Sequence, residues 1–286
     1  MKKTMLAVAL LALCSSSFGG ILKTNNRNAQ QETAAIAAQK KAAESAPSSL
    51  AATSTCSYNF SSGTNNTFLS FCVTVNGNIA QLATPVAREH IAVGTAGEGY
   101  GLCDNTATAA YFDYAGYGDS ANWGAPTLVS QTATAVKIAR TTSDGVWTLT
   151  QTITRVAAAN PAVTVVMLLK NNTAVARSIA LMRYADVDVS GTTSNNFDAT
   201  AGSAFGWDSN GSSTPPYGLM LQNSGNPAGF TNIIPFVQNH PDGPNPCVPG
   251  SVFGPLLATD GSIVMYYAGT VPKNGTRTVT MVYKGM

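Results

Sequence analysis

Charged side chains are scarce in this sequence. Lysine, arginine, aspartate and glutamate make up only 10% of its 286 residues, against about 25% in an average soluble domain. Solubility must therefore come from threonine, serine, asparagine and glutamine, a composition common among extracellular bacterial proteins. From residue 52 onward, ten basic residues face twelve acidic ones, which gives a net charge of −2. Since no basic patch is present, nucleic acid is not expected as a partner.

The motifs of several enzyme classes are also missing. The sequence contains no GxSxG, HExxH, P-loop or GxGxxG pattern, and it has only two histidines. No cofactor is therefore expected, apart from the calcium ion considered below. After the N-terminal segment, no apolar stretch is long enough for a transmembrane helix.

The first 19 residues resemble a secretory signal peptide. A basic start is followed by an apolar run over residues 5–13, too short to span a bilayer, and small residues precede Gly20. An alternative makes Cys14 a lipid-anchored first residue, although the leucine before it departs from the lipoprotein pattern. The sequence thus predicts a secreted, periplasmic or cell-envelope protein.

Residues 20–51 differ in composition from the rest of the chain. They are rich in alanine, glutamine and lysine, which favour helix, but they hold no apolar stripe that a helix would bury. We expect a marginal helix or a flexible linker there, followed by a single domain over residues 52–286.

The pattern of that domain has a period of two. In residues 147–154, Trp147, Leu149, Gln151 and Ile153 point one way and four threonines the other, as in a half-buried strand. Residues 162–171 are apolar on both faces, which predicts a central strand. Hairpins are predicted at Asn76-Gly77 and over residues 272–275. With no long amphipathic helix, the sequence predicts an all-β fold, a large two-sheet antiparallel β-sandwich or super-sandwich.

Four cysteines follow the signal peptide, and an even number in an exported chain predicts two disulfides. Their spacing lacks CxxC, which disfavours a zinc site. Three pairings are possible. If a hairpin is centred near Thr64, Cys56 and Cys72 lie opposite each other, which leaves Cys103 to pair with Cys247.

The segment 183–191, RYADVDVSG, is a candidate cation site. Four of its residues match positions one, three, five and six of a calcium-binding loop: Asp186, Asp188, Ser190 and Gly191. The closing position is Phe197 instead of glutamate, with Asp198 one step on. Alternatively, the aspartates pair with Arg183, because an arginine on an apolar strand face needs a carboxylate partner.

A second candidate site involves Glu98 and the two histidines, His90 and His240. Glu98 lies between glycines that can present its carboxylate, and an acid beside an imidazole can perform acid–base catalysis. A Cys103–Cys247 bridge would bring the loop of His240 toward Glu98. The alternative is a solvated loop glutamate and a histidine hydrogen-bonded at a strand edge.

Aromatic residues with polar neighbours fill residues 109–124, a mixture that suits sugars because ring faces pack on C–H groups while carboxylates and amides bind hydroxyls. The candidate ligand contacts there and nearby are Tyr100, Asp113, Tyr117 and Trp123. Half of these aromatics could equally belong to the core. Residues 205–218 repeat the pattern with Trp207, Asp208 and Tyr217.

Seven segments together resemble a widespread type of exported bacterial protein with no assigned activity, over most of residues 67–286: NGNIAQL, EHIAVG, GEGYGLCD, RTTSDGVWTLTQ, MLLKNNT, RYADVDV and VPKNGTRTVTMVYK. Residues 146–172 and the terminal hairpin also resemble strands of galactose-mutarotase-like β-sandwiches. That second resemblance implies histidine and glutamate acting on a sugar, but no residue here aligns with those roles.

These observations favour an exported protein of binding or structural type that contacts extracellular glycans. One alternative is a sugar-active enzyme, an epimerase, lyase or hydrolase, in which Glu98 acts with His90 or His240. Another is a structural protein of the cell envelope without a small ligand.

Overall fold

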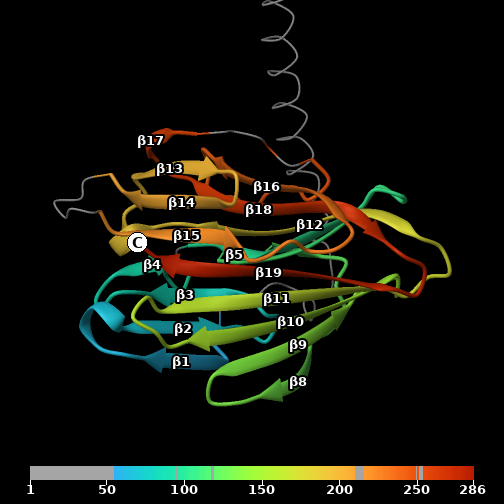
Figure 1. Cartoon of the computed structure of the whole chain (residues 1–286), viewed down its shortest axis with the longest axis horizontal. Helices are drawn as coiled ribbons and strands as arrows, with labels where there is room; N and C mark the ends of the chain where they lie inside the picture. Colours follow the sequence, from blue (N-terminus) through green and yellow to red (C-terminus); the bar gives the residue numbers. More distant parts are fainter. Residues whose placement is uncertain (1–54, 95, 117–118, 210–215, 249, 251–253) are drawn as a thin grey trace, which may run out of the picture.

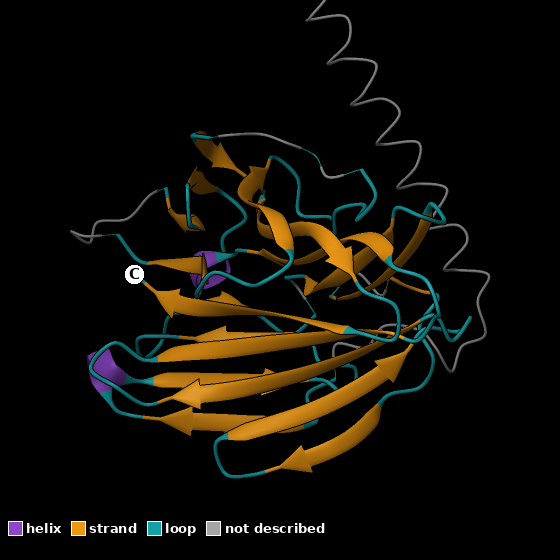
Figure 2. Cartoon of the chain, turned by 45° about the vertical axis from the view of Figure 1, so that its right-hand side comes forward, coloured by secondary structure: helices purple, strands orange, loops and turns teal. Residues whose placement is uncertain are grey.

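The computed structural model describes residues 55–94, 96–116, 119–209, 216–248, 250 and 254–286. The predicted signal peptide, the linker over 20–51, Cys14 and Tyr117 lie outside the described residues. Within them the fold is all-β, as predicted, with only two short 3₁₀ helices, η2 (Asn65–Thr67) and η3 (Val189–Gly191) (Figure 2). None of the described helices has the length and hydrophobicity needed to cross a bilayer.

The chain contains the following strands among its described residues. They are β1 (Tyr58–Ser62), β2 (Leu69–Val73), β3 (Ile79–Ala83), β4 (Glu89–Ile91), β5 (Glu98–Asp104), β6 (Ala109–Ala115), β7 (Asp119–Ala121), β8 (Thr127–Gln131), β9 (Ala135–Thr141), β10 (Trp147–Val156), β11 (Ala162–Asn171), β12 (Arg177–Asp186), β13 (Asn195–Thr200), β14 (Ser203–Asp208), β15 (Gly218–Asn223), β16 (Phe230–Gln238), β17 (Leu256–Thr259), β18 (Ser262–Val271) and β19 (Thr276–Gly285).

The strands form three antiparallel sheets arranged as a β-sandwich, which confirms the predicted fold class. A nine-stranded sheet has the order β17-β13-β14-β15-β19-β11-β10-β9-β8 and lies across the front of the molecule (Figure 1). Behind it lie a six-stranded sheet, β16-β18-β12-β5-β6-β7, and a four-stranded sheet, β1-β2-β3-β4. One core unites all three, because Phe71, Leu181 and Met167 belong to the same buried cluster.

The alternating pattern of β10 forms as predicted. Trp147, Leu149, Gln151 and Ile153 are buried, while the threonines between them are half-exposed. The next strand, β11, lies between β10 and β19 and is therefore central. The sequence is apolar on both faces of this strand, but only the inner face is fully buried, since Leu168 on the outer face is exposed.

One of the two predicted hairpins is wrong. Asn76 and Gly77 do connect the paired strands β2 and β3, and Gly77 has a φ of +91°. By contrast, residues 272–275 carry the chain from the six-stranded sheet to the nine-stranded one, so that β18 and β19 do not pair. The reason lies in the core: Met265 of β18 and Met281 of β19 cover the same cluster from opposite layers.

Both predicted disulfides are present, Cys56–Cys72 and Cys103–Cys247. The register behind the first prediction is wrong, however. Asn59 rather than Cys56 lies opposite Cys72, since the turn between β1 and β2 is centred beyond Thr64. Cys56 precedes the strand and reaches Cys72 with a Cα–Cα distance of 5.5 Å.

The second disulfide holds a loop against the outer face of the six-stranded sheet. The loop residues 243–246 are buried. There Tyr114 donates a hydrogen bond to the carbonyl of Pro244, with 2.5 Å between the oxygens. Beneath the loop, Phe112, Tyr114 and Tyr184 belong to a second apolar cluster. The bridge to Cys103 therefore closes a small core of its own.

Candidate functional site

Glu98, the predicted acid, lies inside the core. Its carboxylate accepts from Arg183 at 2.5 Å (Nε to Oε1) and 3.0 Å (Nη2 to Oε2), and from the Tyr283 hydroxyl at 2.7 Å. The Ile79 amide donates to Oε2 at 2.6 Å, and Arg183 also donates to Gln151. Glu98 and Arg183 are both 0% exposed. Arg183 thus has a carboxylate partner, as predicted for an arginine on an apolar strand face. This partner is Glu98 of β5 rather than one of the two nearby aspartates.

A second buried pair uses three of the predicted ligand contacts. Arg140 binds Asp113 at 2.6 Å (Nη1 to Oδ2) and donates to the Tyr100 hydroxyl at 3.0 Å. Tyr100 in turn donates to the Asn76 carbonyl at 2.8 Å, and the Trp123 ring lies 5.8 Å from the guanidinium. Tyr100, Asp113 and Trp123 have no exposed surface. Their geometry supports a structural role, because none of the three side chains has exposed surface that a glycan could contact.

His90 is likewise fully buried, at the edge strand β4. Its Nε2 lies 2.6 Å from the carbonyl oxygen of Thr84, so that this nitrogen carries the proton. Burial lowers the pKa of His90 to about 4. The imidazole is therefore neutral and enclosed, which agrees with the alternative of a histidine hydrogen-bonded at a strand edge.

The depressed pKa of His90 makes stability fall in acid. Between pH 7 and 4 the unfolded chain binds a proton that the folded His90 refuses, so the free energy of unfolding decreases as pH decreases. We expect a contribution of about 3 kcal/mol. Urea unfolding of the parent and of His90→Gln across this range measures it. A parent and variant with the same pH slope would contradict the assignment.

His240 lies apart from Glu98. Its pKa is lowered by burial, while the nearby charges of Asp242 and Asp260 oppose that effect. Ser262 donates to the His240 carbonyl at 2.9 Å. Glu98 lies at the same end of the six-stranded sheet, but its side chain faces the main core, where it accepts from Arg183 and Tyr283. The predicted acid–base pairs of Glu98 with His90 or His240 therefore lack supporting geometry.

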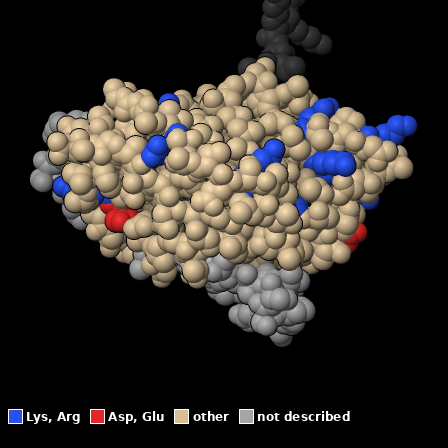
Figure 3. Space-filling model, turned by 90° about the horizontal axis from the view of Figure 1, so that it is seen from below, with Lys and Arg blue, Asp and Glu red and all other residues tan. Residues whose placement is uncertain are grey.

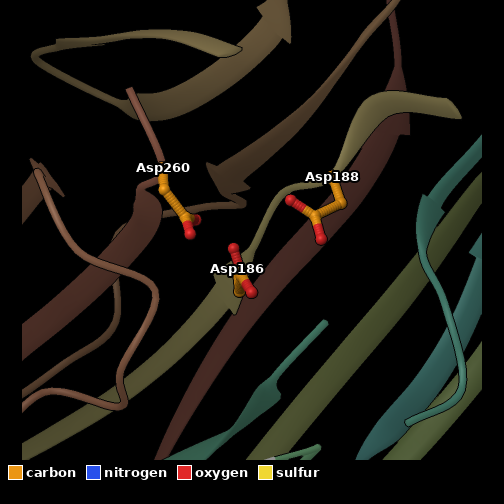
Figure 4. Close-up of side chains that lie close together, drawn as sticks. All are labelled: Asp186, Asp188 and Asp260. Carbon is orange, nitrogen blue, oxygen red and sulfur yellow. The ribbon is translucent and has the colours of Figure 1, made fainter. Parts of the chain in front are cut away.

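Three carboxylates gather where β12 ends. Asp186, Asp188 and Asp260 each offer an oxygen, and these atoms all lie within 4.8 Å of one another (Figure 4). Asp186 and Asp188 are buried, whereas Asp260 is half-exposed. Two of the three are the predicted calcium ligands. Ser190, the third predicted residue, instead accepts a hydrogen bond from Arg88 at 3.2 Å.

The local fold explains why these aspartates converge. Asp186 is the last residue of β12, and the chain then leaves the six-stranded sheet toward η3. The Val187 amide donates to the Gly261 carbonyl at 3.4 Å, and the Asp188 amide to the His90 carbonyl at 3.0 Å. The first of these bonds brings the β17–β18 connection, and with it Asp260, against the end of β12.

An aromatic surface lies on the outer face of the nine-stranded sheet. In β14, Ala204 belongs to the core, and the alternation of the strand places Phe205 and Trp207 outward, where both are half-buried. Their ring centroids are 5.6 Å apart, with an interplanar angle of 33°. Sequence analysis identified Trp207 but not its partner Phe205.

Neighbouring strands place mainly short or polar side chains beside the aromatic pair, with Met220 of β15 opposite Phe205 as the exception. On β13, Asn196 lies opposite Trp207 and Asp198 lies opposite Phe205. On β15, Trp207 faces Gly218, where an added Cβ would lie 2.9 Å from the Trp207 Cβ. We refer to Asn196, Asp198, Phe205 and Trp207 as the aromatic platform. On the face of the molecule shown in Figure 3, most of the surface carries no charged side chains.

No family model matches the chain, and no curated protein matches it either. Among solved structures, it is similar to a bacterial glucoamylase complexed with acarbose, with a TM-score of 0.51 and 10% sequence identity. The match covers 82% of this chain and 33% of the glucoamylase chain. At this identity the likeness concerns the fold, and the chain corresponds to about a third of the larger protein.

Proposed function

We propose that this chain is an exported glycan-binding protein whose sugar-contacting surface is the aromatic platform. The observation that carries the proposal is the half-buried pair Phe205 and Trp207, two adjacent rings on an open sheet face. Aromatic faces pack against the C–H groups of pyranose rings. Two rings on alternate residues of one strand can support consecutive sugars of a chain.

The polar residues of the platform suit the hydroxyl groups of such a ligand. The side-chain oxygen of Asn196, Oδ1, accepts a hydrogen bond from the Ala258 amide. The side-chain NH₂ group of Asn196 can then donate to a sugar hydroxyl. Asp198 adds a carboxylate beside Phe205. Because the platform contains one charged residue among four, we expect a neutral polysaccharide rather than a highly charged one.

Two further observations support this assignment. Two disulfides are typical of an oxidising environment, such as the periplasm or the cell exterior. One solved structure with a similar fold is a bacterial glucoamylase complexed with acarbose. The enzyme alternative has weaker support, because Glu98 and His90 are enclosed in the core.

Affinity electrophoresis in gels containing neutral polysaccharides tests the proposal. We expect Phe205→Ala/Trp207→Ala to weaken binding at least about tenfold, which corresponds to roughly 1.4 kcal/mol lost from two ring contacts. The control is Tyr266→Ala, another half-buried aromatic that lies on the six-stranded sheet. It should retain the parent's affinity.

The two variants separate the competing functions. Absence of retardation of the parent in every neutral polysaccharide would remove the proposal, as would equal loss of binding in both variants. Should the parent bind no glycan but form a complex through the same face with an envelope protein, the structural alternative would replace it.

A further inference from the structure

Asp188 is a buried carboxylate with one oxygen that the described residues leave without a hydrogen bond. It is 4% exposed, and its Oδ1 has no hydrogen-bond partner among the described residues. Figure 4 shows its carboxylate directed toward the space between Asp186 and Asp260. A buried charge in this position is unfavourable unless a cation or donor balances it.

Gln238 provides a second, independent sign at the same place. Neighbouring strands align Asp186 with Ser262 and Ser262 with Gln238, which puts the three residues in one row on one face of the six-stranded sheet. Gln238 is 2% exposed, and its Oε1 has no hydrogen-bond partner among the described residues. Its amide nitrogen is held by the Asp242 carbonyl. A second buried oxygen without a hydrogen-bond partner among the described residues therefore lies in the same row of the sheet as Asp186.

Asp188 and Asp260 form no ion pair with a lysine or arginine of the described residues. The ion pairs of lysine and arginine in that part of the chain involve Glu98, Asp104 and Asp113. Burial raises the pKa of Asp188 to about 6, and the charge of Asp260 adds to this effect. A divalent cation would remove the repulsion and favour the ionised carboxylates.

The cluster also lies where the chain crosses twice between the layers. After Asp186, the chain passes from β12 in the six-stranded sheet to β13 in the nine-stranded sheet. At Asp260, it passes back from β17 in the nine-stranded sheet to β18 in the six-stranded sheet. An ion bound by both segments would join the two crossovers and thus the two layers.

We propose that Asp186, Asp188 and Asp260 bind one calcium ion, with Gln238 Oε1 and water as further ligands. Calcium suits this site because it prefers six to eight oxygen ligands in irregular geometry, and carboxylate and amide oxygens meet that preference. The proposed ligand set keeps two residues of the sequence-predicted loop and replaces Ser190 with Asp260. It does not depend on the glycan-binding proposal.

Thermal unfolding of the full chain tests the site. After treatment with a chelator and desalting, calcium chloride should raise the Tm of the parent in a saturable manner. At about a hundred times the Kd, we expect a rise of roughly 5–10 °C. Sodium chloride at equal ionic strength should have little effect, and magnesium less effect than calcium. Calorimetric titration should give one ion per chain.

Matched variants distinguish a bound ion from general screening. Asp188→Asn and Asp260→Asn should lose the calcium response, yet in chelator each should be at least as stable as the parent, because one repulsive charge is gone. Asp198→Asn, which changes the carboxylate one residue after the closing position of the predicted loop, should keep the full response. An unchanged parent Tm in calcium, an equal rise in Asp188→Asn, or a response to zinc but not calcium would overturn the proposal.

Discussion

Replacing Arg183 with methionine is expected to lower the free energy of unfolding by about 3–5 kcal/mol. The substitution leaves the Glu98 carboxylate in the core without its countercharge, while the Gln151 carbonyl loses a donor at 2.7 Å. Both members of the pair are fully buried, so that water cannot replace the lost contacts. Urea unfolding at neutral pH, followed by circular dichroism, measures the change.

A double variant shows whether the uncompensated charge is the cause. Arg183→Met with Glu98→Gln removes both charges and retains a group that can bond to Tyr283, so it should be more stable than Arg183→Met alone. The control Lys170→Met alters an exposed residue and should change stability by less than about 0.5 kcal/mol. A loss below about 1 kcal/mol in Arg183→Met, or a double variant that is less stable still, would contradict this account.

The sequence predicted well those features that depend on neighbouring residues. The alternation of β10 is visible in the order of its side chains, because one face meets the core and the other meets solvent. The demand of Arg183 for a carboxylate also followed from its place on an apolar strand face. The identity of that carboxylate did not, because Glu98 is distant in sequence and meets Arg183 only when β5 pairs with β12.

The glycines around Glu98 show how a local pattern misled the site prediction. They resemble a flexible loop that presents an acid to solvent. In the structure β5 begins at Glu98 and includes Gly99, where an added Cβ would lie 2.0 Å from the Asp113 carbonyl oxygen. The glycines therefore permit close packing between strands, which no local reasoning about turns could reveal.

The third carboxylate of the cation cluster was missed for a related reason. A calcium loop is sought among consecutive residues, and that search found Asp186 and Asp188. Asp260 joins them only because β18 pairs with β12, which brings the segment just before β18 to the end of β12. A different crossover, from β18 to β19, made the predicted terminal hairpin wrong. Connections between layers, rather than strand patterns, were the part that sequence could not supply.

Removing the Cys103–Cys247 disulfide is expected to destabilise the protein more than removing Cys56–Cys72. The two bridges span 144 and 16 residues. By the loop-entropy model, these spans correspond to about 5 and about 3 kcal/mol of stabilisation. We therefore expect Cys103→Ser/Cys247→Ser to unfold at a lower urea concentration than Cys56→Ser/Cys72→Ser.

Removal of the Cys103–Cys247 disulfide should also cause a local change that removal of Cys56–Cys72 does not cause. Cys247 anchors the loop whose Pro244 carbonyl accepts from Tyr114, so its release should uncover Phe112 and Tyr114. Hydrogen exchange should then increase in β6 well before global unfolding, because the apolar cluster beneath the loop loses its cover. In Cys56→Ser/Cys72→Ser, β6 should exchange as in the parent. Equal stability of the two double variants, with β6 protected in both, would show that neither loop length nor the loop's contacts stabilise the fold as argued.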